Sequence, residues 1–358
     1  MIASSLGTTV HDLLVRAVNE DVSDLFITAG SPIMFKRQGE IAPSSDFRMM
    51  PKDTALFIEE IFRLSGNHSY EEYLKSGDCD FSFSLPGVGR FRINAFRQRN
   101  SMAAVIRVVQ LSLADAQTLG IPPAVLDLYR KTKGLVLVTG PAGSGKSTTL
   151  SSLISLINHK RNCHILTLED PIEYLHNHKM SIVNQREVES DTESYATALR
   201  AALRQSPDVV LVGEMRDYET ISIALTAAET GHLVLSTLHT VGAAKTIDRI
   251  MDVFPPNQQN QVRIQLSTVL QAVVSQQLLP SHTKGRLAVF EVMLVNPAIR
   301  SMIREAKTHQ IDTVIHASGT EGMQSMDLAL ADAVRAGHIT REDAFAYCVN
   351  AEVLVKYV

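Results

Sequence analysis

The chain has 358 residues, 45% hydrophobic and 20% charged, which is the composition of a folded globular protein and a length that favours two domains over one. Its formal net charge of −4 argues against nucleic-acid binding, which usually needs a basic surplus. No apolar run approaches the ~18 residues that cross a membrane and no signal peptide is evident, so we expect a cytoplasmic protein that reaches a membrane only through partners.

The N-terminal third predicts a mixed α+β domain, which we bound at residues 1–110. Apolar residues recur at helical spacing between Val10 and Val18. Two segments that alternate with period two flank a turn signal at residues 86–87, which predicts a β-hairpin. Polar and small residues then predict a linker over residues 111–123. Short apolar runs predict further strands in this domain at residues 25–27, 33–35 and 105–109.

Beyond the linker, residues 124–358 predict an α/β domain. Short apolar segments alternate with helical stretches, which is typical of a largely parallel sheet with helices on its faces. After Pro256 an apolar stripe that starts at Val262 predicts one long helix over residues 262–279. The predicted strands of the parallel sheet are residues 135–138, 165–168, 209–212 and 233–235.

A glycine-rich segment between the first of these strands and the next helical stretch matches the pattern GxxxxGK[ST] in full. Its backbone N–H groups and the helix N-terminus would wrap phosphate groups. Within it Lys146 would neutralise the β- and γ-phosphates, and Ser147 would ligate Mg²⁺. We therefore predict that ATP and Mg²⁺ bind here, on Gly140, Pro141, Ala142, Gly143, Ser144, Gly145, Lys146, Ser147 and Thr148.

Three other predicted strands end in polar residues that would meet at the same edge of the sheet. Glu214 follows residues 209–212 and is placed to polarise the attacking water or to order the water shell of the metal. Three carboxylates follow residues 165–168: Glu169 and Asp170 are candidate metal ligands, and Glu173 is a candidate catalytic group. His239 follows residues 233–235. Charged groups that converge in this way need phosphates and cations to balance them, although solvated loop acids and a structural histidine remain alternatives.

At these motifs the sequence resembles the secretion ATPase superfamily, and specifically the PilT family of type IV pilus retraction ATPases. The similar segments are LEDPIEY at 168–174, GEMRD at 213–217 and TLHT at 237–240. AIRSMIRE at 298–305 is similar to the C-terminal motif of the retraction branch. Its apolar seam leaves Arg300 and Arg304 facing elsewhere, which indicates a coupling element or, alternatively, a helix that buttresses the core.

The resemblance implies a PAS-like N-terminal domain, a RecA-like ATPase domain and a homohexameric ring with ATP between domains. It also implies that Arg92 and Arg107 reach a neighbouring subunit's nucleotide, although their alternation with apolar residues alone would indicate a solvated strand face. The implied function is pilus retraction and twitching motility, driven by ATP hydrolysis in a ring docked on an inner-membrane platform protein.

The main alternative is a sister ATPase for pilus assembly or type II secretion. Such enzymes usually carry a longer N-terminal region and a tetracysteine zinc site, and Cys79, Cys163 and Cys348 match no zinc-ligand spacing. A RecA-like DNA motor and a nucleotide-gated scaffold without turnover also remain alternatives.

Overall fold

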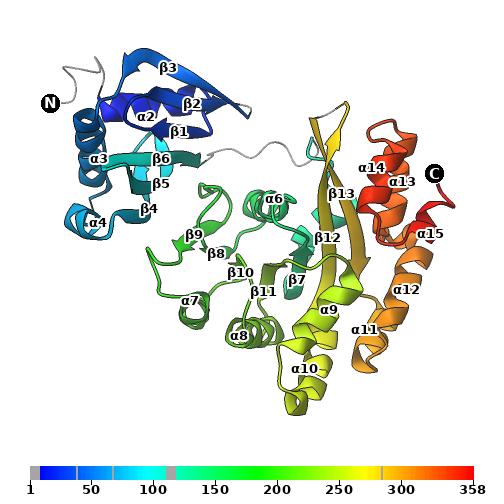
Figure 1. Cartoon of the computed structure of the whole chain (residues 1–358). Coiled ribbons are helices and arrows are strands. Elements are labelled where there is room, and N and C mark those ends of the chain that lie inside the picture. The colour runs from blue at the N-terminus through cyan, green and yellow to red at the C-terminus, as the bar shows by residue number, and fades with distance from the viewer. Residues whose placement is uncertain (1–8, 38, 67, 110–117, 284) are drawn as a thin grey trace. The chain divides into compact units, whose positions relative to one another are not determined.

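The computed structural model describes residues 9–37, 39–66, 68–109, 118–283 and 285–358, and Figure 1 traces the chain through them. The chain divides into two compact units, with the main boundary at residues 112 and 113. Most of the predicted linker, residues 111–117, lies outside the described residues. We describe each unit by itself.

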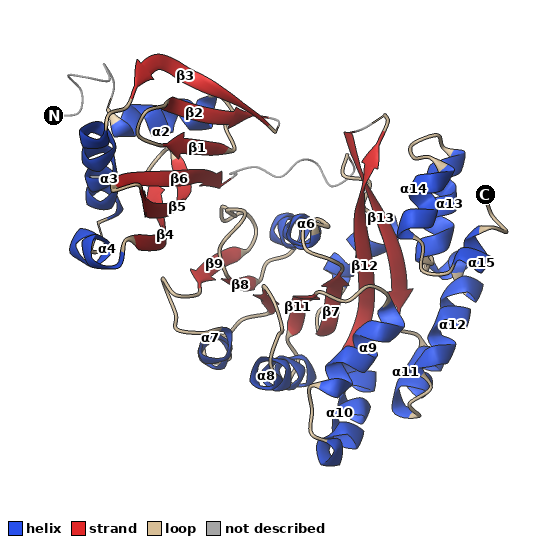
Figure 2. Ribbon diagram, viewed as in Figure 1, coloured by secondary structure: helices blue, strands red, loops and turns tan. Residues whose placement is uncertain are grey.

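The first unit is an antiparallel sheet with helices, which confirms the predicted α+β class (Figure 2). The strand order is β3-β2-β1-β6-β5-β4. Its helices are α2 (Val10–Asn19), α3 (Pro51–Ser65) and α4 (Tyr70–Ser76). The predicted N-terminal helix and the hairpin β4–β5 are both present. The strands are β1 (Asp24–Ile27), β2 (Pro32–Arg37), β3 (Glu40–Arg48), β4 (Asp78–Leu85), β5 (Gly89–Gln98) and β6 (Ser101–Val109).

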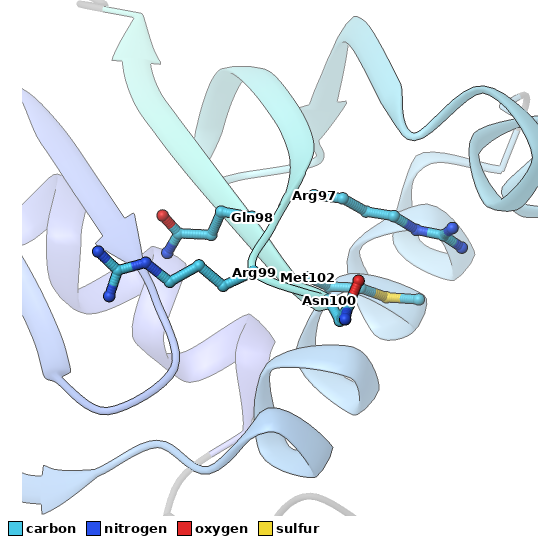
Figure 3. Close-up of a pocket in the computed structure, with 5 residues that line it drawn as sticks. All are labelled: Arg97, Gln98, Arg99, Asn100 and Met102. Atoms are coloured by element: carbon cyan, nitrogen blue, oxygen red, sulfur yellow. The ribbon is translucent and has the colours of Figure 1, made fainter.

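A surface pocket of about 500 Å³ lies at the turn between β5 and β6. Arg99 and Asn100 form this turn with φ of 47° and 62°. Figure 3 shows that the side chains of Arg97 and Arg99 point to opposite sides of the turn. The two guanidinium charges therefore do not converge on one ligand position.

The second unit is built on a seven-stranded sheet with the order β13-β12-β7-β11-β10-β8-β9. Every neighbouring pair is parallel except β12 and β13, so the predicted α/β class is confirmed. The four strands predicted from the sequence are all present. The strands are β7 (Gly134–Thr139), β8 (His164–Glu169), β9 (Ile182–Glu187), β10 (Val209–Val212), β11 (Leu233–Leu238), β12 (Leu270–Ser281) and β13 (Gly285–Leu294).

Helices cover both faces of this sheet because its strands are apolar on both sides. Along β7, Val136 and Val138 pack under α6, whereas Leu135 and Leu137 face the core formed with α7 to α11. The helices are α5 (Pro123–Leu126), α6 (Lys146–Lys160), α7 (Tyr195–Ala202), α8 (Tyr218–Glu229), α9 (Ala243–Asp252), α10 (Pro256–Val269), α11 (Pro297–Arg304), α12 (Ile311–Ala317), α13 (Met326–Arg335), α14 (Arg341–Tyr347) and α15 (Ala351–Leu354).

The predicted long helix over residues 262–279 is wrong. Helix α10 ends at Val269, and the chain continues as β12, which pairs with β7 on one side and β13 on the other. Residues 272–277 are all buried, as in a central strand with cores on both faces. A short apolar run of this kind has no periodicity that separates strand from helix, and the ladder to β7 decides the structure.

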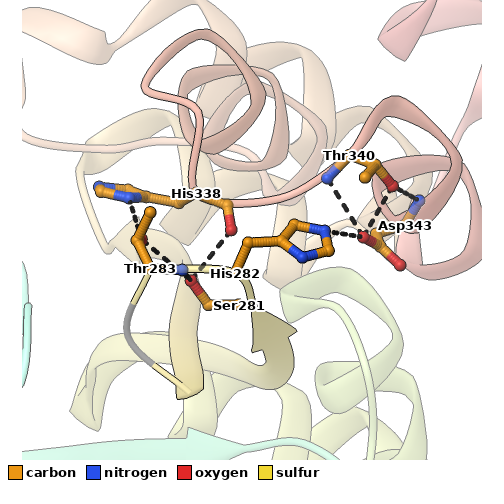
Figure 4. Close-up of polar contacts among 6 residues, drawn as sticks. All are labelled: Ser281, His282, Thr283, His338, Thr340 and Asp343. Atoms are coloured by element: carbon orange, nitrogen blue, oxygen red, sulfur yellow. Dashed lines mark hydrogen bonds and ion pairs between the residues drawn. The ribbon is translucent and has the colours of Figure 1, made fainter.

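The far end of the β12–β13 hairpin is tied to the loop before α14 (Figure 4). Ser281 Oγ donates to the backbone oxygen of His338 at 2.9 Å, and Thr283 Oγ1 lies 2.9 Å from Nδ1 of the same histidine. His282 pairs with Asp343, whose backbone N–H donates to Oγ1 of Thr340, the residue that caps α14. Within the described residues, no helix is both long and apolar enough to span a membrane.

Candidate nucleotide site

The glycine-rich loop joins β7 to α6, as the sequence predicts. Gly145 precedes the helix with φ of 87°, a left-handed conformation that favours glycine. A Cβ on Gly140 would lie 2.1 Å from the backbone oxygen of Gln276 in β12, and one on Gly145 would lie 2.9 Å from the Gln276 side-chain nitrogen. The loop therefore needs glycine at both positions to lie against β12.

Lys146 is folded into this loop. Its Nζ donates to the backbone oxygens of Gly140 at 2.9 Å and Pro141 at 3.0 Å, and the residue is 8% exposed. These carbonyls satisfy a buried ammonium group that a phosphate could engage instead. The nearby Ser144 Oγ is buried and has no hydrogen-bond partner among the described residues. A buried cation beside an unsatisfied hydroxyl, at a helix N-terminus, fits the phosphates of a nucleotide.

The first turn of α6 is anchored to β12. Ser147 and Thr148 are half-buried there, with Ser147 at the position that ligates Mg²⁺ in this motif. The next residue, Thr149, donates from Oγ1 to Gln276 Oε1 at 2.7 Å. Gln276 was not predicted as a site residue, because its segment was expected to be helical.

Glu214 and His239, predicted from two separate strand ends, lie together. Glu214 Oε1 lies 2.9 Å from Nε2 of His239, and the Glu214 side chain is 14% exposed. Strands β10 and β11 are parallel neighbours, and Thr237 Oγ1 donates to the backbone oxygen of Gly213 at 2.6 Å. This bond holds the ends of the two strands in register, so their following side chains meet.

Arg216 completes this group and was not predicted. One Nη of Arg216 lies 2.6 Å from Glu214 Oε2, and this hydrogen bond with Glu214 raises the pKa of Arg216. Both carboxylate oxygens of Glu214 thus have a partner. The sequence feature that could have identified Arg216 is its place in the GEMRD segment, two residues after Glu214.

In the acidic segment after β8, Glu169 is hydrogen-bonded to side chains of β8 and β9, whereas the later carboxylates are exposed. Glu169 Oε1 accepts hydrogen bonds from Thr167 Oγ1 at 2.6 Å and Gln185 Nε2 at 3.1 Å. Asp170 and Glu173 are exposed. The part of the chain that the structure describes holds no cluster of three His, Cys, Asp or Glu side chains that could bind a metal alone. A magnesium ion here would also need the Ser147 hydroxyl and phosphate oxygens as ligands.

The predicted arginines lie on the first unit and differ in their surroundings. Arg92 of β5 and Arg107 of β6 are cross-strand partners, and both are exposed. Arg107 Nε donates at 2.9 Å to Oδ1 of Asp24, a residue that is 5% exposed. Arg107 therefore compensates a buried carboxylate within its own unit.

The two C-terminal arginines also differ. Arg300 of α11 donates from Nη1 to the backbone oxygens of Ser267 at 2.6 Å and Thr268 at 2.8 Å. These are carbonyls of the last turn of α10. The half-buried guanidinium group of Arg300 therefore caps the C-terminus of α10, a contact that the apolar seam alone does not predict. Arg304 is exposed.

These features together define a P-loop ATPase: a glycine loop after β7, a buried lysine at the N-terminus of α6, and a carboxylate after β10, two strands along the sheet. Residues 3–345 match the family model described as "Type II/IV secretion system protein". The chain belongs to this family, as the motifs predicted.

Similar proteins include the type IV pilus retraction ATPase PilT of Pseudomonas aeruginosa, 45% identical over 335 residues, which are 94% of this chain and 96% of the relative. A Neisseria gonorrhoeae twitching motility protein is 50% identical, covering 98% and 93% of the two chains. The crystal structure of the pilus retraction motor PilT with bound ADP superposes with a TM-score of 0.89 at 45% identity, covering 98% of this chain and 99% of that one. The predicted resemblance to the PilT family is confirmed.

Proposed function

We propose that this protein hydrolyses ATP to power the retraction of type IV pili, and hence twitching motility. The observation that carries the proposal is the near full-length similarity to a protein named as a pilus retraction ATPase. The complete glycine loop and the Glu214–His239 pair support turnover.

The P-loop would bind the phosphates and hold them for attack. Lys146 would exchange its loop carbonyls for phosphate oxygens, and the N–H groups at the start of α6 would add partial positive charge. Ser147, Glu169 and Asp170 would hold Mg²⁺ directly or through water. When bound, Mg²⁺ would neutralise charge on the phosphate oxygens.

Glu214 would orient the attacking water and accept its proton. His239 and Arg216 engage one carboxylate oxygen each, so the carboxylate is held in one orientation before the substrate arrives. Such preorganisation lowers the barrier because the group need not be ordered during the reaction. Glu173 is the further candidate catalytic group of the same acidic segment.

The protein would work as a homohexamer in the cytoplasm, docked on the inner-membrane platform of the pilus machinery, with no nucleic acid involved. Arg92 and Arg107 would reach the nucleotide of the neighbouring subunit and neutralise charge in the transition state. To test action in trans, inactive Lys146→Ala and Arg92→Ala subunits are mixed and reassembled. Mixed rings should recover ATPase activity at junctions that carry neither lesion, and rings shown to be mixed that recover none would contradict action in trans.

Steady-state phosphate release by the purified full chain tests turnover. Activity should require Mg²⁺ and should be unaffected by single-stranded DNA, which would stimulate a DNA motor. Lys146→Ala should reduce activity more than about tenfold, or about 1.4 kcal/mol of barrier. Activity retained above this level would overturn the P-loop assignment, and a wild-type chain without turnover would indicate a nucleotide-gated scaffold.

A further inference from the structure

A tyrosine outside the predicted site residues lies at the acidic edge of the nucleotide site. Tyr195 is the first residue of α7, and the helix is capped by Ser194, whose Oγ accepts from the Thr197 N–H at 3.1 Å. The Tyr195 ring is half-buried and packs against the core formed by α7 to α11 and the sheet. Its ring is therefore fixed by packing, which sets the position of the hydroxyl at its tip.

The hydroxyl reaches the backbone immediately before Glu214. A Cβ on Gly213 would lie 2.8 Å from Tyr195 Oη and 3.2 Å from the backbone oxygen of Leu168. The Gly213 N–H donates to that same Leu168 oxygen at 2.7 Å. The Tyr195 hydroxyl thus lies beside the carboxyl ends of the neighbouring strands β8 and β10. Gly213 does not adopt a left-handed conformation, so space rather than backbone strain excludes a side chain there.

The charges around this hydroxyl are mainly negative. Burial raises the pKa of Tyr195 above its ordinary value, the charges of Asp170, Glu214 and Glu169 raise it further, and Arg216 opposes them. The phenol therefore stays protonated at neutral pH. It is a neutral group that can donate a hydrogen bond among carboxylates without adding a charge.

We propose that Tyr195 is a positioning residue of the ATPase site, whose hydroxyl packs against Gly213 and so fixes the backbone that carries Glu214. A cation at this position would compete with Mg²⁺ for the same carboxylates, whereas a phenol does not. Gly213 is small because the hydroxyl occupies the space that its side chain would need. The inference rests on the proposed ATPase function.

Tyr195→Phe removes only the hydroxyl and tests the role directly in the full-length assembled protein. The kcat for ATP should fall by about fivefold or more, because the backbone before Glu214 loses the contact that positions it. The KM for ATP and the Kd for ADP should change less than about twofold, because the phosphate-binding groups are untouched. A wild-type kcat would overturn the proposal, and so would a loss of kcat that only parallels lost nucleotide affinity and lowered Tm.

Tyr218→Phe is the matched control. Tyr218 is also the first residue of its helix, α8, but its hydroxyl donates to Gln258 Oε1 at 2.8 Å. Removal of that hydroxyl should leave kcat within about twofold of wild type, as for most exposed changes. An equal loss of kcat in both variants would contradict a specific role for Tyr195.

The contact with Gly213 is tested by a double-mutant cycle. Gly213→Ala should lower both Tm and kcat in the wild-type background, because its methyl group meets the hydroxyl oxygen. In the Tyr195→Phe background Gly213→Ala should cost at most about half as much Tm, since residues in contact are not additive. Equal costs in both backgrounds would overturn the contact. This Tm cycle does not depend on ATP turnover, so a wild-type chain that lacked ATPase activity would overturn the proposed function and leave the contact to be decided separately.

Discussion

Glu214 Oε1 lies 2.9 Å from Nε2 of His239, although 25 positions separate the two residues in the sequence. The pair joins the ends of two neighbouring parallel strands at the edge where the glycine loop also lies. Since Arg216 holds the other oxygen, the orientation of Glu214 is set by groups from two elements. The chemistry we assign to Glu214 depends on that orientation.

Glu214→Gln should retain nucleotide binding and lose turnover. The amide keeps the shape of the side chain but cannot accept a proton from water, and general-base catalysis is worth about 10²–10⁴ in rate. The measurement is kcat for ATP beside the Kd for ADP in the same preparation. A variant that folds normally but no longer binds nucleotide would make Glu214 a structural support instead.

Arg107→Ala should destabilise the first unit, whereas Arg92→Ala should not. Loss of the Arg107 guanidinium leaves the buried Asp24 carboxylate with a hydrogen bond from Ser23 Oγ at 3.0 Å and Lys36 at 4.0 Å, at a cost of about 1–3 kcal/mol. Chemical denaturation measures the free energy of unfolding. Arg92→Ala, at an exposed position, should change it by less than about 0.5 kcal/mol.

Asp24→Asn combined with Arg107→Ala provides the control for this ion pair. The double variant should be more stable than the sum of the two single changes predicts, because no buried charge is left without its partner. Strict additivity would show that the pair contributes nothing. A loss of ATPase activity in Arg92→Ala can then be interpreted without a stability correction.

Alanine substitutions of Arg300 and Arg304 should have different effects, the first on stability and the second on twitching. Arg300→Ala removes two hydrogen bonds from a charged donor to the end of α10 and should cost about 1.5 kcal/mol or more of stability. Arg304→Ala should leave stability and ATPase activity near wild type while twitching is lost, if this exposed face couples the ring to the machinery. ATPase activity and twitching that fall in proportion in Arg304→Ala would end the coupling hypothesis.

His176 should make the protein less stable in mild acid. Burial, together with the charge of His159, lowers the pKa of His176 from 6.5 to about 4, and its Nε2 lies 3.0 Å from Ser151 Oγ. Between these two pH values the unfolded chain binds the proton and the folded chain does not. The contribution of this histidine to stability is therefore present at neutral pH and is lost as pH falls through the window, on the order of 1 kcal/mol per pH unit.

His176→Gln should remove that part of the pH dependence. The measurement is the free energy of unfolding at pH 7 and pH 5 for the variant and the wild type, with the exposed His309→Gln as the matched control. The slope should become shallower in His176→Gln alone. Parallel slopes in all three proteins would contradict a buried neutral His176.

Much of the second unit could be predicted because its signals are local. The strand before Gly140, the glycine loop and the lysine follow one another in the sequence, and the carboxyl ends of parallel strands must share an edge. That rule also brought Glu214 and His239 to the same place. The rule is less informative for Asp170 and Glu173, because the side chains of a loop are directed by their contacts and not by the direction of the preceding strand.

The features that were missed depend on contacts between distant segments. Strand β12 carries no helix-breaking residue before Pro280, so only its ladder to β7 distinguishes it from a helix. Gln276 and Tyr195 reach the site through that ladder and through the packing of α7, and neither stands next to a recognisable motif. Arg300 could be placed on a helix, but not against the end of α10, because the turn of the chain at Leu270 was unknown.

The central claim is that this ATPase withdraws pili, and the most direct measurement is the retraction of labelled pili on living cells that lack the gene. We predict surplus surface pili that extend but do not retract, with retraction restored by the wild-type chain and not by Lys146→Ala. Cells without pili would contradict the account and identify an assembly motor instead.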